Sequence, residues 1–280
     1  MQVPTCRYVD RYNAPSTAMD ALDPELLSAW AREAGLTSPS VVVRALDEGP
    51  SGTLDPERAL YPASMIKTPL VACALLEIAA GRLDPHARVR VGASNLTSQD
   101  APSPLTAGYE ARIDELCDLA ISRSDNVATN VLFDLIGRER ATELAQQQLG
   151  LAHTVFARKL SGSEPLIDDP GWDGFTRNAH PAGDAATLFR AVALDAIPGS
   201  DLIRGALVRQ YWNDKLSRGL RSGDRFAHKT GDTDDADHDG GILTTAEGRV
   251  YVIVVYTGLA STDDNNARFA PFMRALRARL

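Results

Sequence analysis

The chain has 280 residues, of which 44% are hydrophobic, and a net charge of −8. This length can bury a full core, as one large domain or as two packed lobes. The acidic balance argues against nucleic acid and against anionic membrane surfaces, because both attract clustered Lys and Arg. No apolar run reaches the roughly 18 residues of a membrane helix.

The first ten residues contain no apolar segment typical of a signal peptide. We therefore expect a cytoplasmic protein, or a periplasmic or secreted one if an export signal is missing from this chain. Residues 1–22 are expected to form an N-terminal extension. The three cysteines are too few for a disulfide framework, and Cys73 and Cys117 lie in apolar patterns that favour buried thiols.

The next stretch predicts a helix, two strands and a second helix. The first helix is expected over Asp23–Gly35, from Asp-Pro to Gly. A β-branched run predicts a strand over Ser40–Leu46, and a second short strand is expected from Ser51 to Leu60. The apolar run after Ser64 predicts a buried helix that ends before the glycine at position 81.

The middle of the chain, from about residue 62 to 195, has a mostly helical pattern. Further helices are expected at Ala111–Arg123, Val127–Ile136, Glu139–Leu149, Pro181–Leu194 and Asp201–Tyr211. Residues 158–178 break this rhythm with Gly, Pro, Asp and Ser. A structureless loop of this length in a compact domain indicates function or disorder.

The last third predicts strands again. They are expected at Phe226–Gly231, Gly240–Thr245 and Arg249–Thr257, before a closing helix over Asn266–Leu280. Strands at both ends and helices between them predict an α/β fold of the α+β type. A mixed lobe with an antiparallel sheet flanked by helices would comprise residues 23–61 and 212–280, and an all-helical lobe residues 62–211.

Ser64 and Lys67 stand three residues apart at the start of a predicted helix, so they share one face. A hydroxyl is a weak nucleophile unless a base takes its proton, and an amine on the same face could do so. Taken alone, the pair is more simply a capping serine and a solvated lysine.

Two further motifs change this interpretation. Ser-Asp-Asn at 124–126 lies between two predicted helices, and Lys-Thr-Gly at 229–231 lies on a predicted strand. Together with Ser-x-x-Lys, in this order, they resemble the class A serine β-lactamases and penicillin-binding proteins. The separation of Ser64 and Ser124 (124 − 64 = 60 residues) agrees with class A. The resemblance covers about residues 23–280 and implies a β-lactamase/transpeptidase-like fold with the active site between the two lobes.

The resemblance also implies roles for the motif residues. Ser64 would attack the carbonyl carbon of a strained amide, and Lys67 would activate it or keep the site electropositive. Ser124 would relay a proton to the departing nitrogen. Asn126 would hold Lys67 and the side-chain amide of the substrate.

The Lys-Thr-Gly strand would complete the site. Lys229 and Thr230 would lower the pKa of Ser124 and bind a substrate carboxylate. The backbone N–H groups of Ser64 and Asp232 would hold the oxyanion, with Gly231 between Thr230 and Asp232 on the substrate-binding edge.

A β-lactamase must also hydrolyse its acyl-enzyme, and class A enzymes use a loop glutamate in the pattern E-x-x-L-N. Glu164 fits its first position, but Asp168 stands where the asparagine would be. The stretch from Ser124 to Glu164, 40 residues, is longer than is typical of the family. Glu164 is therefore either the deacylating base or a loop residue paired with Arg158 or Lys159.

The segment after Gly231 departs from the family, because residues 232–239 contain five aspartates. Most β-lactams are anions, and a carboxylate about 4 Å away would repel them by about 1–4 kcal/mol. Either Asp232 points outward on a solvated hairpin, or cations restore a positive potential. The candidates for that role are Arg221, Arg225 and Arg268.

No cofactor or metal is expected, because the histidines show no metal-ligand spacing and there is no Gly-rich phosphate loop. The five histidines are His86, His153, His180, His228 and His238. His228, next to Lys229, is expected to point away from the site. Trp30 and Trp212 are expected in the core, and Trp172 is expected to anchor its loop.

Three hypotheses remain open. The first is a monomeric serine β-lactamase that acts on a small-molecule substrate. The second is a related acyl-serine esterase or D-alanyl-D-alanine peptidase with little β-lactam turnover. The third is a non-catalytic protein that binds or senses β-lactams.

Overall fold

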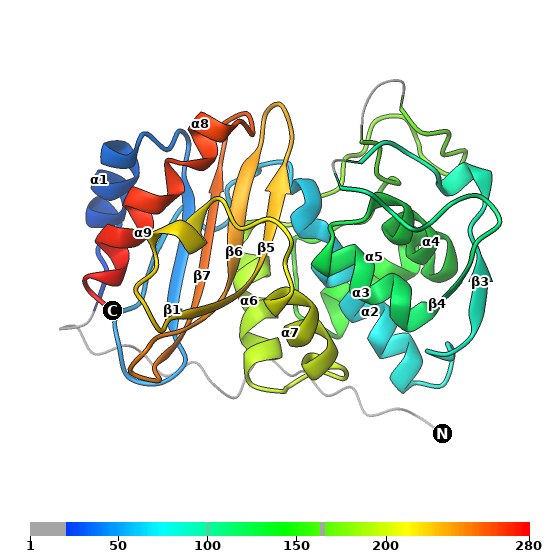
Figure 1. Cartoon of the computed structure of the whole chain (residues 1–280), viewed down its shortest axis with the longest axis horizontal. Helices are drawn as coiled ribbons and strands as arrows, with labels where there is room; N and C mark the ends of the chain where they lie inside the picture. Colours follow the sequence, from blue (N-terminus) through cyan, green and yellow to red (C-terminus); the bar gives the residue numbers. More distant parts are fainter. Residues whose placement is uncertain (1–20, 100, 163–165) are drawn as a thin grey trace.

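The computed structural model describes residues 21–99, 101–162 and 166–280 (Figure 1). The expected deacylating residue, Glu164, lies outside the described residues. So does the expected N-terminal extension, except for its last two residues. Leu22, one of these two, is buried, and its N–H donates to the Ser51 carbonyl oxygen.

A five-stranded antiparallel sheet forms the centre of the molecule, in the order β2-β1-β7-β6-β5. Its strands are β1 (Ser40–Ala45), β2 (Gly52–Leu54), β5 (Arg225–Asp232), β6 (Asp237–Thr244) and β7 (Val250–Thr257). The N-terminal strand β1 therefore pairs with the C-terminal strand β7, as the distribution of strands in the sequence predicts.

Two strand boundaries differ from the prediction. β2 ends at Leu54 rather than near Leu60, because Asp55 turns the chain with a φ of 45°. β6 begins at Asp237 rather than Gly240, so part of the acidic segment is paired strand and only residues 233–236 form the hairpin tip.

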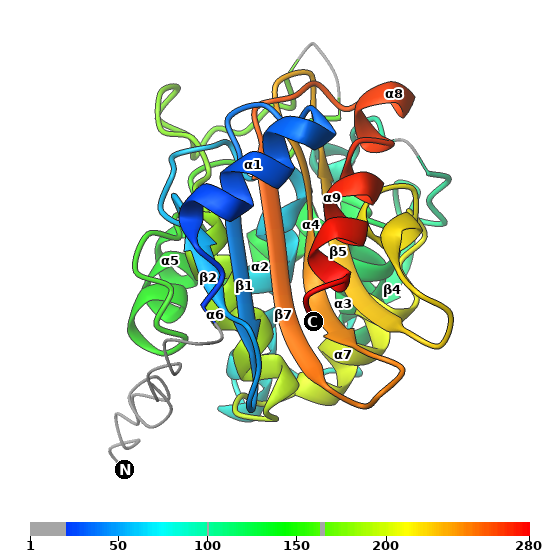
Figure 2. The same cartoon turned by 90° about the vertical axis from the view of Figure 1, so that its left-hand side faces the viewer.

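Helices α1 (Pro24–Ala34) and α9 (Phe269–Arg277) cover one face of the sheet, with the short α8 (Asp263–Asn266) before α9 (Figure 2). Asp23 caps α1 by accepting a hydrogen bond from the Glu25 N–H, and Gly35 ends it with a φ of 78°. The expected first helix is confirmed, because Asp and Gly each supply the terminus they favour.

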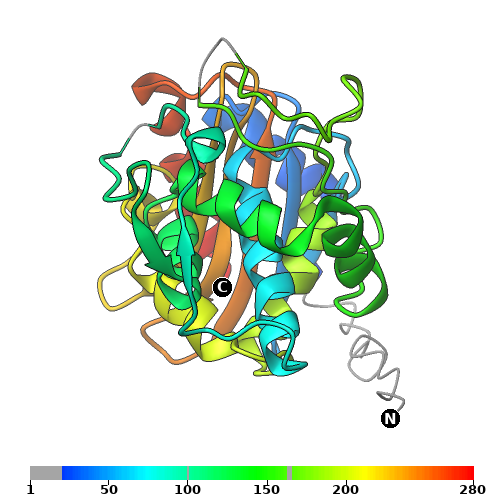
Figure 3. The same cartoon turned by 90° about the vertical axis from the view of Figure 1, so that its right-hand side faces the viewer.

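The other helices lie on the opposite face (Figures 1 and 3). They are α2 (Lys67–Ala79), α3 (Ile113–Ser122), α4 (Asn126–Ile136), α5 (Arg138–Gln147), α6 (Ala182–Ala193) and α7 (Ser200–Val208). α6 packs directly on the sheet, and every residue of α2 from Lys67 to Glu77 is buried. One hydrophobic core joins the sheet face to all six helices, so the division into two lobes stays a prediction.

A small two-stranded sheet was not predicted. β3 (Arg88–Arg90) and β4 (Glu110–Arg112) pair antiparallel within the stretch that was expected to be mostly helical. Each strand has only three residues, with one apolar residue between two charged ones, which is too short to give a recognisable alternation in the sequence.

The expected loop over 158–178 contains no helix or strand in its described residues, 158–162 and 166–178. A backbone bridge between Val155 and Ala179 joins its two ends. Cys73 and Cys117 are buried free thiols, as expected. Among the described residues, no helix has the length and apolar character needed to cross a bilayer.

Candidate active site

Ser64 lies in a 3-10 turn, Ala63–Ile66, that runs directly into α2. The residue before it, Ala63, has a φ of 48°, a strained conformation of the kind found at functional sites. Strand β5 packs against this turn at Gly231. A Cβ there would lie 3.1 Å from both the Pro62 carbonyl oxygen and the Met65 side chain. The glycine therefore lets β5 approach the serine turn closely.

Ser124 also has left-handed backbone geometry, with a φ of 56°. It is not the cap of α4. Asp125 has that role, because its carboxylate accepts a hydrogen bond of 2.8 Å from the Ala128 N–H. The capping residue thus leaves the Ser124 hydroxyl available for other partners.

Two lysines meet at that hydroxyl. Ser124 Oγ accepts hydrogen bonds from Lys67 Nζ at 3.1 Å and from Lys229 Nζ at 2.8 Å. Lys67 also donates to the Ser124 carbonyl oxygen and to Asn126 Oδ1, the latter at 2.7 Å. Both lysines are fully buried, so the simpler interpretation of Lys67 as a solvated side chain is wrong.

The two lysines are unusual because both donate to the same neutral hydroxyl, that of Ser124, and not to a carboxylate. Burial, and next the charge of Lys67, lower the pKa of Lys229 well below its ordinary value. Beyond Lys229, the buried hydroxyl of Thr230 has no hydrogen-bond partner among the described residues. This part of the site can therefore both exchange protons and donate to an anionic group.

Asn126 is held by residues that the sequence motifs do not contain. Its Nδ2 donates to the Ser98 carbonyl oxygen, and its backbone N–H donates to Gln99 Oε1, both at 3.0 Å. Gln99 was missed because it lies in a segment without a motif or a periodic pattern. It fixes the turn that carries Ser124 and Asn126.

Part of the acidic edge is paired with a cation from inside the protein. The ammonium of Lys215 lies 2.6 Å from Asp232 Oδ1 and 2.5 Å from Asp237 Oδ1, and Asp232 also accepts from Ser261. Burial opposes the ionisation of Asp232, but Lys215 outweighs it and lowers the pKa of that carboxyl. The last carboxylate, Asp239, pairs with His228 at 2.7 Å.

These contacts correct the expectation about the counter-charges. Arg221, Arg225 and Arg268 do not line the cavity at Ser64, and Lys215 is the residue that pairs with Asp232. His228 is buried between Asp239 and Asn213, as a structural residue would be.

The cavity at Ser64 has a volume of about 660 Å³, and Ser124, Asn126 and Asp232 also line it. Its rim carries three arginines stacked on aromatic rings: Arg123 on Tyr211 at 5.0 Å, Arg158 on Trp172 at 4.6 Å and Arg177 on Tyr61 at 4.5 Å. Trp212 was expected in the core, but it is half-buried and lines this cavity.

Comparison with known proteins agrees with this geometry. A family model described as "Beta-lactamase enzyme family" matches residues 24–276. The chain belongs to this family. It is also similar to the "Beta-lactamase regulatory protein BlaB" of Streptomyces cacaoi, at 25% identity over 89% of this chain and 94% of that protein.

Solved structures show the same fold. The β-lactamase from Sphaerobacter thermophilus DSM 20745 superposes with a TM-score of 0.78 at 24% identity, over 92% of this chain and 98% of the other. An acyl-enzyme complex of a PBP-A mutant with penicillin G superposes with a TM-score of 0.77 at 23% identity, over 91% and 94%. The β-lactamase/transpeptidase-like fold predicted from the motifs is confirmed.

Proposed function

We propose that this protein is a serine hydrolase that opens the amide bond of β-lactams through an acyl-enzyme on Ser64. The observation that carries the proposal concerns Ser124, which lines the same cavity as Ser64 and whose hydroxyl accepts hydrogen bonds from two buried lysines. The two lysines can take up and deliver protons through the Ser124 hydroxyl, and Lys67 follows Ser64 by three residues.

Acylation would proceed in a proton-balanced sequence. Lys67 first passes a proton through the Ser124 hydroxyl to Lys229. Ser64 Oγ then attacks the lactam carbonyl carbon while its proton passes to the Lys67 amine so formed, and the N–H groups of Ser64 and Asp232 hold the oxyanion. The C–N bond then breaks, and its nitrogen takes the proton of Ser124. Lys67, within 3.1 Å, returns a proton to Ser124. In deacylation, water would attack the acyl carbon and pass its proton to Glu164, and Ser64 would regain a proton as the ester bond breaks.

The substrate carboxylate would bind beside Ser124, the cavity-lining residue that Lys229 contacts. The buried Thr230 hydroxyl, which has no partner among the described residues, lies next to Lys229 in the chain, and Asp232 is paired with Lys215. Three guanidinium groups on the rim add further positive charge. These groups offset the repulsion expected from the acidic segment.

Intact-protein mass spectrometry after addition of benzylpenicillin tests the proposal. We expect a Ser64 adduct that disappears as penicilloic acid accumulates. Ser64→Ala should give no adduct. Ser161→Ala, a change in a serine of the same cavity outside the motifs, should still be acylated. Glu164→Gln should form the adduct and retain it; turnover at the wild-type rate would exclude Glu164 as the base.

The same time course separates the alternatives. A stable adduct in the wild type would favour a sensor or regulatory role, which the name of the Streptomyces cacaoi relative also favours. No adduct with any β-lactam, but cleavage of p-nitrophenyl esters, would favour the esterase or peptidase alternative.

A further inference from the structure

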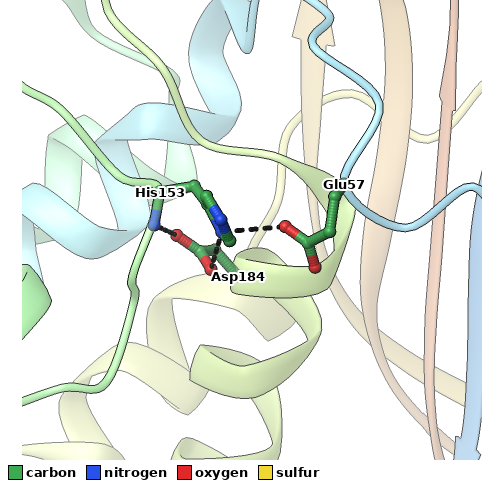
Figure 4. A group of neighbouring side chains, drawn as sticks. All are labelled: Glu57, His153 and Asp184. Atoms are coloured by element: carbon green, nitrogen blue, oxygen red, sulfur yellow. Dashed lines mark hydrogen bonds and ion pairs between the residues drawn. The ribbon is translucent and has the colours of Figure 1, made fainter.

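A second cavity, of about 240 Å³, shares no lining residue with the cavity at Ser64. It contains Glu57, His153 and Asp184, which come from the turn after β2, the turn after α5 and the first turn of α6. Figure 4 shows the imidazole of His153 between the two carboxylates. His153 Nδ1 lies 2.9 Å from Glu57 Oε2 and 3.8 Å from Asp184 Oδ1.

We propose that Glu57, His153 and Asp184 bind a divalent transition-metal ion of the zinc class, with water completing its coordination. One nitrogen and two carboxylate oxygens are a donor set that suits Zn²⁺, whereas Mg²⁺ and Ca²⁺ prefer oxygen alone. A tetrahedral ion with bonds of about 2.0–2.2 Å needs donor atoms about 3.3–3.6 Å apart. The separations of 2.9 Å and 3.8 Å bracket this value, and all three donors lie within 4.8 Å of one another.

The buried member of the set is held in a fixed orientation. Asp184, whose side chain is 7% exposed, accepts through Oδ2 from the His153 N–H at 2.9 Å and from Thr154 Oγ1 at 2.7 Å. Thr154 Oγ1 lies in turn 2.8 Å from the buried His180 Nδ1. Such outer contacts orient a ligand carboxylate and leave its second oxygen, Oδ1, directed at the imidazole.

The approach of Glu57 depends on a glycine. The Gly183 N–H donates to the Pro56 carbonyl oxygen at 2.9 Å, which holds the Glu57 turn against the start of α6. A Cβ at Gly183 would lie 2.3 Å from Glu57 Oε1. The residue next to Asp184 therefore makes room for the second carboxylate.

Charge also favours a cation. Arg44 lines the same cavity, but the two carboxylates outweigh its single positive charge. The simpler alternative is a protonated His153 paired with its neighbours. Glu57 and His153 are 52% and 61% exposed, and an ion pair so exposed adds little stability. A bound ion would join three distant segments near the Val155–Ala179 bridge that closes the 158–178 loop.

Calorimetric titration of the untagged, metal-stripped protein with ZnCl₂ tests this site without any catalytic readout, so its outcome is independent of the proposed hydrolase activity. We expect one Zn²⁺ per chain, a rise of Tm by several degrees, and no comparable effect of MgCl₂. CoCl₂ should give the visible absorption of tetrahedral Co²⁺.

His153→Ala and Glu57→Gln should each weaken Zn²⁺ binding by about tenfold or more, and the exposure of both side chains means that the variants should fold. His86→Ala is the matched control, because His86 is an exposed histidine whose imidazole contacts one carboxylate, Asp114 at 3.4 Å, and the guanidinium of Arg112. It should bind Zn²⁺ like the wild type. Absence of saturable binding, or binding that persists in both ligand variants, would overturn the proposal.

Discussion

Two buried lysines lie near the end of β5, and their surroundings differ sharply. Lys215 and Lys229 are 1% and 0% exposed. Lys215 lies within 2.6 Å of two carboxylates, Asp232 and Asp237, whereas Lys229 Nζ donates to the Ser124 hydroxyl and the Thr230 carbonyl oxygen. Burial works against the charge of both. The carboxylates outweigh it and raise the pKa of Lys215, while burial and the charge of Lys67 lower that of Lys229.

The contrast shows that a buried lysine can either stabilise the fold, as Lys215 does, or exchange a proton, as proposed for Lys229. A lysine paired with two carboxylates stays charged and holds the backbone, and Lys215 also donates to the carbonyl oxygens of Gly231 and His238. A buried lysine without such a partner has a lowered pKa and gives up its proton more readily. Substitutions at the two positions should therefore change different measurable quantities.

Replacing Lys229 should have the largest effect on chemistry. Lys229→Met removes the ammonium from Ser124 and should lower the acylation rate constant for benzylpenicillin by about 10²–10⁴-fold. Its free energy of unfolding should not fall, because a poorly compensated buried charge is removed. Stopped-flow labelling and chemical denaturation measure the two quantities.

The conservative change Lys229→Arg is the matched control. Arginine keeps a positive charge but has a different geometry and does not lose its proton. The variant should therefore acylate faster than Lys229→Met but should not exchange a proton at this position. Wild-type acylation by Lys229→Met would remove Lys229 from the proposed mechanism.

Replacing Lys215 should have the largest effect on stability. Lys215→Met leaves Asp232 and Asp237 without their cation and should lower the free energy of unfolding by about 3–5 kcal/mol. Urea denaturation measures the loss. Adding Asp237→Asn to Lys215→Met should restore much of it, because Asp237 is the fully buried carboxylate. If the double variant is no more stable than the single one, the pairing is not what stabilises this strand end.

Buried histidines extend the comparison to groups that are already neutral. Burial lowers the pKa of His180 to about 3 and that of His238 to about 4. In the unfolded chain both histidines take up protons near pH 6.5, whereas in the folded protein they stay neutral until a lower pH. The free energy of unfolding is therefore highest above pH 6.5 and decreases as the pH falls toward 4. Each histidine contributes a slope of about 1.4 kcal/mol per pH unit. Asp237, whose pKa burial raises to about 6, partly offsets this slope below that pH.

Denaturation midpoints between pH 7 and 4 measure the slope. His180→Gln keeps a hydrogen-bonding side chain but does not titrate, so its slope should be smaller by about 1.4 kcal/mol per pH unit. An unchanged slope would mean that His180 is protonated in the folded state.

The sequence predicts those parts of the fold and site that local patterns encode. Ser64 and Lys67 lie where the 3-10 turn Ala63–Ile66 runs into α2, the expected last two strands pair as β6 and β7, and Asp23 and Gly35 bound α1. Each of these follows from residues a few positions apart. The antiparallel sheet could be predicted because β-branched runs occur at both ends of the chain.

The remaining features depend on contacts between distant segments. Lys215 meets Asp232, Gln99 holds Asn126, and no motif or period marks Lys215 or Gln99 in the sequence. The cluster of Glu57, His153 and Asp184 has no ligand spacing, because its members are brought together only by the packing of α6. Only the folded chain shows these pairs.

The smallest expected effect concerns the carboxylates that Lys215 does not reach. Asp234 and Asp235 are exposed at the hairpin tip and line the cavity. Asp234→Asn and Asp235→Asn should each raise the acylation rate with anionic penicillins by no more than about fivefold, since exposed charges contribute about 1 kcal/mol or less. The gain should disappear at high salt and with a neutral ester substrate.

The rim arginine Arg177 provides the opposite test, because Arg177→Gln should slow anionic penicillins by a similar factor. Asp232→Asn should bring no gain, since Lys215 already neutralises that carboxylate at 2.6 Å. If Asp232→Asn accelerates acylation more than the tip variants do, the negative charge at the binding edge is not neutralised by Lys215. The contrast between the two lysines would then no longer explain how an acidic strand end can accept an anionic substrate.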